Sequence, residues 1–212
     1  MSVVHGEQVR PLEEHVEVGR SLNWWGMILF ISSEALIFAN LIAAYLYLEV
    51  RGLQIKDGLW LLPSGEHLDW TFALGNTAIL LLSSIPAVYA RRSITKGNKK
   101  GLIIGLAGAI FLGAVFLGGQ VYEYINLYSE HFTLQTKVFG SAFFTLTGFH
   151  GLHVSIGILF MVICLIRATR GDFTAKKHFA VEAAEMYWHF VDIVWIIVFS
   201  VVYLLPLLMI QG

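Results

Sequence analysis

The sequence predicts an all-α polytopic membrane protein, a bundle of five transmembrane helices, and two observations carry that prediction. Of 212 residues, 57% are hydrophobic and only 14% are charged, with a mean hydropathy of +0.69, which is typical of membrane proteins. A hydrocarbon core about 30 Å thick requires about 20 apolar residues in a helix. Five windows of at least this length occur, at 24–48, 70–90, 102–125, 138–166 and 187–210. Their continuous apolarity disfavours the short alternating strands of a membrane barrel.

The distribution of basic residues predicts the orientation of these helices. Residues 1–23 are expected to form a cytoplasmic tail and residues 24–210 one transmembrane domain with short connections. The tail lacks the features of a secretory signal, so the first helix is expected to remain in the mature protein. The tail and the connections on its side of the membrane together hold 11 Lys and Arg residues. The connections on the opposite side hold 3. The positive-inside bias places the amino terminus in the cytoplasm and the carboxyl terminus outside. The net charge of −1 gives no general attraction to nucleic acid.

The first window contains Glu34 about ten residues beyond Trp24, close to halfway through the hydrocarbon at 1.5 Å per residue. Burial there favours the neutral acid form of the carboxyl, which can donate a hydrogen bond to a neighbouring helix. Two interpretations stay open. The carboxyl is either a satisfied structural group or a carrier of protons.

The second window is bounded by Trp70 and Tyr89, aromatic residues that suit the two membrane interfaces. In the third window, small residues recur at intervals of four, a pattern that lets another helix approach closely. This helix-packing stripe consists of Gly101, Gly105, Ala109 and Gly113. A cofactor groove is the alternative. Glu123 lies at the far end of the same window, where it either reaches the outer interface or joins a buried polar group.

The fourth and fifth windows carry histidines at membrane depth, where ionisable side chains need a partner. His150 and His153 share one face of the fourth helix, and His189 and Asp192 share one face of the fifth. Haem bound between His150 and His189, or a metal site, is one explanation. The spacing of ligands fits a di-iron bundle poorly. We therefore expect no metal site, and we expect Glu123, His150, His153, His189 and Asp192 to form a structural polar lattice that fixes the third, fourth and fifth helices.

Four stretches, in this order along the chain, resemble subunit III of the haem-copper terminal oxidases. They are Ile31-Ser-Ser-Glu-Ala-Leu-Ile-Phe38, Gly119-Gln-Val-Tyr-Glu-Tyr124, Phe143-Phe-Thr-Leu-Thr-Gly-Phe-His-Gly-Leu-His-Val-Ser-Ile-Gly157 and Tyr187-Trp-His-Phe-Val-Asp-Ile-Val-Trp195. The five windows are similar to the last five helices of the seven-helix mitochondrial form, as in many bacterial oxidases. In this family, the glutamate that matches Glu34 is a buried carboxyl known for reacting with a carbodiimide.

The resemblance implies a multi-pass subunit of an aerobic respiratory complex in a bacterial cytoplasmic membrane. It implies no catalytic residue and no cofactor in this chain, with haem and copper held by partner subunits. The expected direct partner is subunit I, whose proton uptake and stability this subunit supports. Subunit II, small subunits and membrane lipids, including structural phospholipid, are further expected partners. A quinol oxidase is the alternative to a cytochrome c oxidase. An independent haem- or di-iron-binding membrane enzyme is the alternative of another class.

Overall fold

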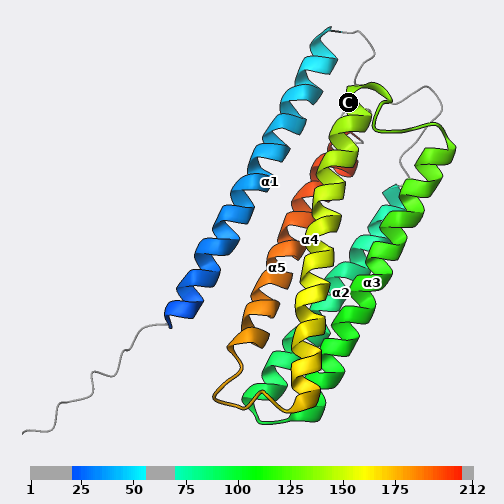
Figure 1. Cartoon of the computed structure of the whole chain (residues 1–212). Helices are drawn as coiled ribbons and strands as arrows, with labels where there is room; N and C mark the ends of the chain where they lie inside the picture. Colours follow the sequence, from blue (N-terminus) through cyan, green and yellow to red (C-terminus); the bar gives the residue numbers. More distant parts are fainter. Residues whose placement is uncertain (1–20, 56–69, 207–212) are drawn as a thin grey trace, which may run out of the picture.

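Helices form nearly all of the chain that the computed structural model describes, which is residues 21–55 and 70–206 (Figure 1). The elements are α1 (Leu22–Ile55), α2 (Trp70–Thr95), α3 (Lys99–Ser129), α4 (Lys137–Arg170), α5 (Phe179–Phe199) and a π-helical turn, η1 (Ser200–Leu204). Five helices are long and apolar enough to cross a membrane, and the described residues contain no strand. The predicted all-α, five-helix membrane fold is confirmed. Residues 1–20 of the predicted tail and residues 207–210 of the predicted fifth window lie outside the described residues.

The helices extend beyond the apolar windows from which they were predicted. Among them, α5 begins at Phe179, well before Tyr187, and α4 continues to Arg170. The reason is that hydrocarbon thickness limits the apolar window, whereas backbone hydrogen bonding continues into the headgroup region. Arg167 and Arg170 lie in the last turn of α4, where long basic side chains reach water.

Two glycine-containing turns bring the helices antiparallel at one end of the molecule (Figure 1). Gly97 has a φ of +74°, and the Asn98 side chain accepts a hydrogen bond of 3.0 Å from the amide of Gly101, which caps α3. Gly171, with a φ of +83°, ends α4. These turns keep both of the most basic connections at the same end. The assignment of that end to the cytoplasm remains a prediction.

The helices α2, α3, α4 and α5 pack into a bundle, while α1 leans against its side along α4 and α5 (Figure 1). Trp188 and Trp195 of α5 are at most 1% exposed. Their indole N–H groups donate hydrogen bonds of 2.9 Å to the hydroxyls of Ser83 and Thr77 on α2. These bonds fix the register of the antiparallel pair α2 and α5 inside the membrane.

The small-residue stripe of α3 faces the interior of this bundle, chiefly α2. A Cβ atom added to Gly105 would come within 2.6 Å of the carbonyl oxygen of Pro86 and 2.7 Å of the amide nitrogen of Ala90. At Gly101 it would meet the Ser93 side chain, and at Gly113 the indole of Trp188. Ala109, the fourth member, is fully buried. The stripe therefore sets how closely the backbones of α2 and α3 approach.

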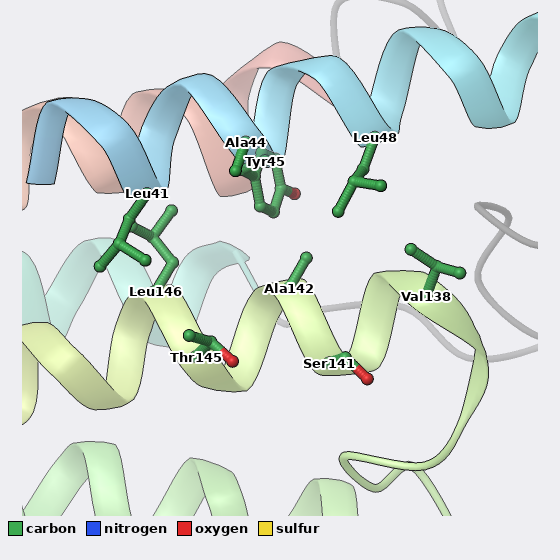
Figure 2. A pocket seen from close by; sticks show the side chains of 9 residues that line it. All are labelled: Leu41, Ala44, Tyr45, Leu48, Val138, Ser141, Ala142, Thr145 and Leu146. Atoms are coloured by element: carbon green, nitrogen blue, oxygen red, sulfur yellow. The ribbon is translucent and has the colours of Figure 1, made fainter.

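Most of α1 is exposed, and between Leu22 and Gly52 only Phe38, Tyr45 and Glu49 are buried. Towards its carboxyl end, α1 is separated from α4 by an open hollow of about 220 Å³ (Figure 2). The lining is mostly aliphatic, and the ring of Tyr45 projects towards α4. The hollow is lined by Leu41, Ala44, Tyr45, Leu48, Val138, Ser141, Ala142, Thr145 and Leu146.

Candidate functional site

A carboxyl–imidazole pair joins α1 to α4, about a third of the way along α1 and near the middle of α4. Oε2 of Glu34 lies 2.9 Å from Nε2 of His153, and Nδ1 of His153 lies 2.8 Å from the carbonyl oxygen of Phe149. The side chain of His153 is 6% exposed and that of Glu34 is 21% exposed. Phe38 covers the imidazole, with ring centroids 4.7 Å apart. The position of Glu34, twelve residues into α1, places it about 18 Å from the start of the helix.

The hydrogen bonds of His153 determine how many protons this pair holds. A carbonyl oxygen only accepts, so Nδ1 carries the proton that it donates to Phe149. One further proton then lies between Nε2 and Glu34, on the carboxyl or on the ring. In the first case a neutral acid donates to a neutral imidazole, and in the second a carboxylate accepts from an imidazolium. The pair has no net charge in either case, which lowers the free energy of burying it.

His150 has different surroundings although it lies one helical turn away. It is 0% exposed, and neither ring nitrogen has a hydrogen-bond partner among the described residues. Its imidazole lies 4.6 Å, between ring centroids, from Trp195 and 6.0 Å from Phe116. His150 therefore fills an aromatic core rather than joining the Glu34–His153 pair.

A second polar group lies where α2 meets α5. Arg91 forms an ion pair with Glu185, and the hydroxyl of Ser84 donates to Oδ2 of Asp192. His189 stands between the two carboxylates, with Nε2 3.7 Å from Glu185 and Nδ1 3.7 Å from Asp192. The side chains of Glu185 and Asp192 are both 8% exposed, whereas that of His189 is 42% exposed. We call Ser84, Arg91, Glu185, His189 and Asp192 the α2–α5 charged group.

A third polar group holds the other end of the bundle. The phenol of Tyr203 donates a hydrogen bond of 2.9 Å to Oε1 of Glu123, and the Gln120 amide lies 3.3 Å from Oε2 of the same carboxylate. Tyr203 belongs to η1, so the π-helical turn carries a residue that bonds α3. Such turns alter which residues face a helix partner. Tyr124 and Thr147 link α3 to α4 nearby, with their oxygens 2.7 Å apart.

The structure divides the five residues of the predicted lattice among three polar groups and an aromatic core. His153 pairs with Glu34, His189 and Asp192 belong to the α2–α5 charged group, Glu123 bonds Tyr203, and His150 lies among aromatic rings. The link from His153 goes to α1, a helix outside the predicted lattice. No group of three or more His, Cys, Asp or Glu residues suited to a metal ion occurs in the described part of the chain.

Several residues of these groups were not singled out from the sequence. In the sequence, Arg91 contributes only to the basic connection after the second window. Ser84 is one of several small polar residues in that apolar window. The available signal was the set of polar residues inside the second window, since a polar side chain in a transmembrane helix normally faces a partner. Those residues are Asn76, Thr77, Ser83 and Ser84.

Comparisons with known proteins show which family the sequence resembles. The family model of cytochrome c oxidase subunit III matches residues 8–206. The chain is 41% identical over 203 residues to cytochrome c oxidase subunit 3 of Latimeria chalumnae, which covers 95% of this chain and 74% of that protein. It is 43% identical over 181 residues to the protein of the same name from Thermostichus vulcanus, covering 85% and 86% of the two chains. It is 41% identical over 180 residues to cytochrome c oxidase subunit 3 of Cyprinus carpio, covering 84% of this chain and 68% of that protein.

Proposed function

Because this chain belongs to the cytochrome c oxidase subunit III family, we propose that it is a cofactor-free accessory subunit of a proton-pumping haem-copper oxygen reductase. The proposed location is a bacterial cytoplasmic membrane. Subunit I, which holds the haem and copper of oxygen reduction, is the proposed direct partner. Cytochrome c is the proposed electron donor rather than quinol, because the matched relatives are named cytochrome c oxidase subunits.

The role that we propose is to sustain proton uptake by subunit I and to protect subunit I during turnover. The Glu34–His153 pair is the observation that supports this role. It joins the mostly exposed helix α1 to α4 through one shared proton, and either location of that proton leaves the pair neutral. A neutral pair can bind a proton near subunit I and release it again, and between these events it leaves no charge buried in the membrane. The chemistry of oxygen reduction belongs to the partner.

The hollow between α1 and α4 supports a further part of the proposal, a structural phospholipid. Its lining is aliphatic on both helices, with the hydroxyls of Ser141 and Thr145 as polar additions (Figure 2). An acyl chain would fill it and would hold α1 at its present distance from α4. Lipid extraction from the purified complex, followed by mass spectrometry, tests this part. Loss of a stoichiometric phospholipid in a Leu41→Trp variant is the expected result, because the indole occupies the hollow.

The test of the main proposal compares the complete oxidase with an oxidase that lacks this chain and with a Glu34→Ala variant. All three should show the same haem and copper content and a similar initial rate of oxygen consumption. Activity should then decline over successive turnovers in the oxidase without the chain, and sooner in Glu34→Ala than in the wild type. Glu123→Gln, which alters another buried carboxyl, is the matched control and should keep the wild-type time course. Haem retained by the isolated chain would overturn the accessory role.

A further inference from the structure

Three phenyl rings, each from a different helix, surround the imidazole of His153. Between ring centroids, Phe38 of α1 lies 4.7 Å from it, Phe149 of α4 lies 5.9 Å away and Phe190 of α5 lies 6.5 Å away. We call these three residues the phenyl clamp. Phe38 makes the closest of the three contacts and also meets Phe190, at 6.2 Å. The clamp therefore joins α1, α4 and α5 around the ring that bonds Glu34.

Phe38 is buried on a helix that is otherwise largely exposed. It follows Glu34 by four residues, so the two side chains lie on the same face of α1. Phe38 is 2% exposed, whereas Phe30, which precedes Glu34 by four residues, is 47% exposed. Phe30 stacks on Tyr187 of α5, with ring centroids 6.3 Å apart. Phe38 thus belongs to the helix of the carboxyl and packs on the imidazole that this carboxyl bonds.

An open hollow borders the phenyl clamp between α1 and α5. Its volume is about 430 Å³, and its lining includes Phe38 and Phe190. The hydrogen bonds of His153 lie in the plane of the ring, to the carbonyl oxygen of Phe149 and to Glu34. Rings packed around the imidazole resist tilting, because a tilted ring loses van der Waals contacts. Without the ring of Phe38, the imidazole would have room to tilt towards the hollow and away from the carboxyl.

We propose that Phe38 is a positioning residue of the Glu34–His153 pair, whose ring holds the imidazole at hydrogen-bond distance from the carboxyl and so keeps the shared proton between the two side chains. The proposal rests on the proposed function, in which this pair binds and releases a proton. Proton transfer requires the two heavy atoms to stay about 2.6–3.2 Å apart. Nε2 of His153 and Oε2 of Glu34 meet this condition at 2.9 Å. The clamp maintains this distance although α1 is mostly exposed.

Infrared difference spectra of the intact oxidase test this positioning. Each variant is compared with the same variant carrying Glu34→Gln, so that the difference spectrum reports the pair. Phe38→Leu keeps an apolar side chain but removes the ring, and the population in which the bond is broken should rise about fivefold or more. The carbonyl stretch of Glu34 should then shift to higher wavenumber, as for a carboxyl without a hydrogen-bond partner. A Phe38→Leu spectrum identical to that of the wild type would overturn the proposal.

Phe139→Leu is the matched control for packing between α1 and α4. Phe139 is 3% exposed, precedes His153 by fourteen residues on α4, and packs on Tyr45 of α1 with ring centroids 6.4 Å apart. This variant loses a buried ring at the same helix contact and should keep the wild-type bands of the pair. Phe38→Tyr, which keeps the phenyl ring, should also show wild-type bands. A shift of the same size in Phe139→Leu or in Phe38→Tyr would contradict the positioning role.

The time course of turnover distinguishes failure of this inference from failure of the proposed function. The Phe38→Leu oxidase should lose activity sooner than the wild type and no sooner than Glu34→Ala, at unchanged haem content. If Phe38→Leu shifted the bands while both variants kept the wild-type time course, the positioning role would stand and the proposed function would fail. If Glu34→Ala declined early while Phe38→Leu left the bands unshifted, the positioning role alone would fail.

Discussion

The imidazole of His153 on α4 lies 2.9 Å from the carboxyl of Glu34 on α1, and this contact crosses from the bundle to a helix that is largely exposed. The ring is fixed by its second bond, to the carbonyl of Phe149. The bond to Phe149 therefore orients the imidazole so that Nε2 faces Glu34. The contact is neutral if the proton between the two side chains lies on the carboxyl of Glu34, and ionic if it lies on the ring of His153.

The first prediction concerns the location of that proton. The hydrocarbon environment disfavours separated charges, so we expect Glu34 to be the neutral acid that donates to Nε2 of His153. Infrared difference spectra of wild type against Glu34→Gln at neutral pH should show the carbonyl stretch of a protonated carboxyl. The same comparison for Glu123→Gln provides a reference carboxyl. Carboxylate bands alone in the Glu34 difference spectrum would show the ionic form instead.

The second prediction is that Glu34→Ala and Glu34→Gln differ in stability. Alanine leaves Nε2 of His153 without its partner, which should cost about 1–3 kcal/mol, as expected for a buried polar group left unsatisfied. The glutamine amide can donate to the same nitrogen and should cost less than half as much. Thermal unfolding of this subunit within the purified oxidase measures the difference. Equal losses in the two variants would mean that the bond contributes little to the attachment of α1.

The third prediction contrasts two histidines that are one helical turn apart. His153→Leu breaks the link to Glu34 and should destabilise the subunit by about 1–3 kcal/mol. His150→Leu removes two unpaired ring nitrogens but also a ring contact with Trp195, an effect worth about 0.5–1.5 kcal/mol. The two contributions offset each other, so His150→Leu should be close to wild type. The same unfolding measurement tests both variants, and a larger loss for His150→Leu would contradict the assignment.

The five helices could be predicted from the sequence because a long apolar window indicates a segment that is surrounded by hydrocarbon. The composition and length of the windows suffice for this, and no knowledge of neighbours is needed. The helix ends were harder, because residues such as Phe179 lie outside the hydrocarbon, where hydropathy no longer distinguishes helix from connection. The depth of Glu34 could also be predicted, since it depends only on the rise per residue.

The partners of the buried polar residues could not be predicted in the same way. Spacing shows that His150 and His153 share a face of α4, yet a face is broad enough for one ring to meet Glu34 and the other to meet Trp195. Which partner each meets depends on the rotation and position of α1 and α5 around α4. Those are set by side-chain packing over the whole bundle, which helical periodicity within one segment does not report.

The fourth prediction measures the contact between α2 and α5. The indole of Trp188 donates to the hydroxyl of Ser83, and both residues are fully buried. A double-mutant cycle of Trp188→Phe and Ser83→Ala should give a coupling of about 0.6 kcal/mol, and no more than about 1.7, the range of hydrogen bonds between membrane helices. Ser155→Ala replaces an exposed serine that bonds only its own helix and should show no coupling with Trp188→Phe. Zero coupling between Trp188 and Ser83 would mean that these residues stabilise the contact of α2 with α5 through packing alone.

The last prediction tests the closeness of α2 and α3 with two glycines of the same helix. In Gly105→Ala the new methyl group would lie 2.6 Å from the carbonyl oxygen of Pro86 and 2.7 Å from the amide nitrogen of Ala90. Both atoms are backbone, so the helices must move apart, at about 1–3 kcal/mol for overpacking. In Gly118→Ala nothing lies within 4 Å of the new Cβ atom. Alanine should stabilise that position by up to about 1 kcal/mol through its higher helix propensity.

Thermal unfolding of the two variants in the purified oxidase should therefore give shifts of opposite sign. Because the substitution is the same and both sites lie within α3, the contrast isolates the contact with α2 from any general effect of alanine. Movement of α2 would also disturb the Trp188–Ser83 bond, since Ser83 precedes Pro86 by less than one turn. Combining Gly105→Ala with Ser83→Ala should consequently cost less than the sum of the two single changes. Strict additivity would show that α2 accommodates the methyl group without shifting at Ser83.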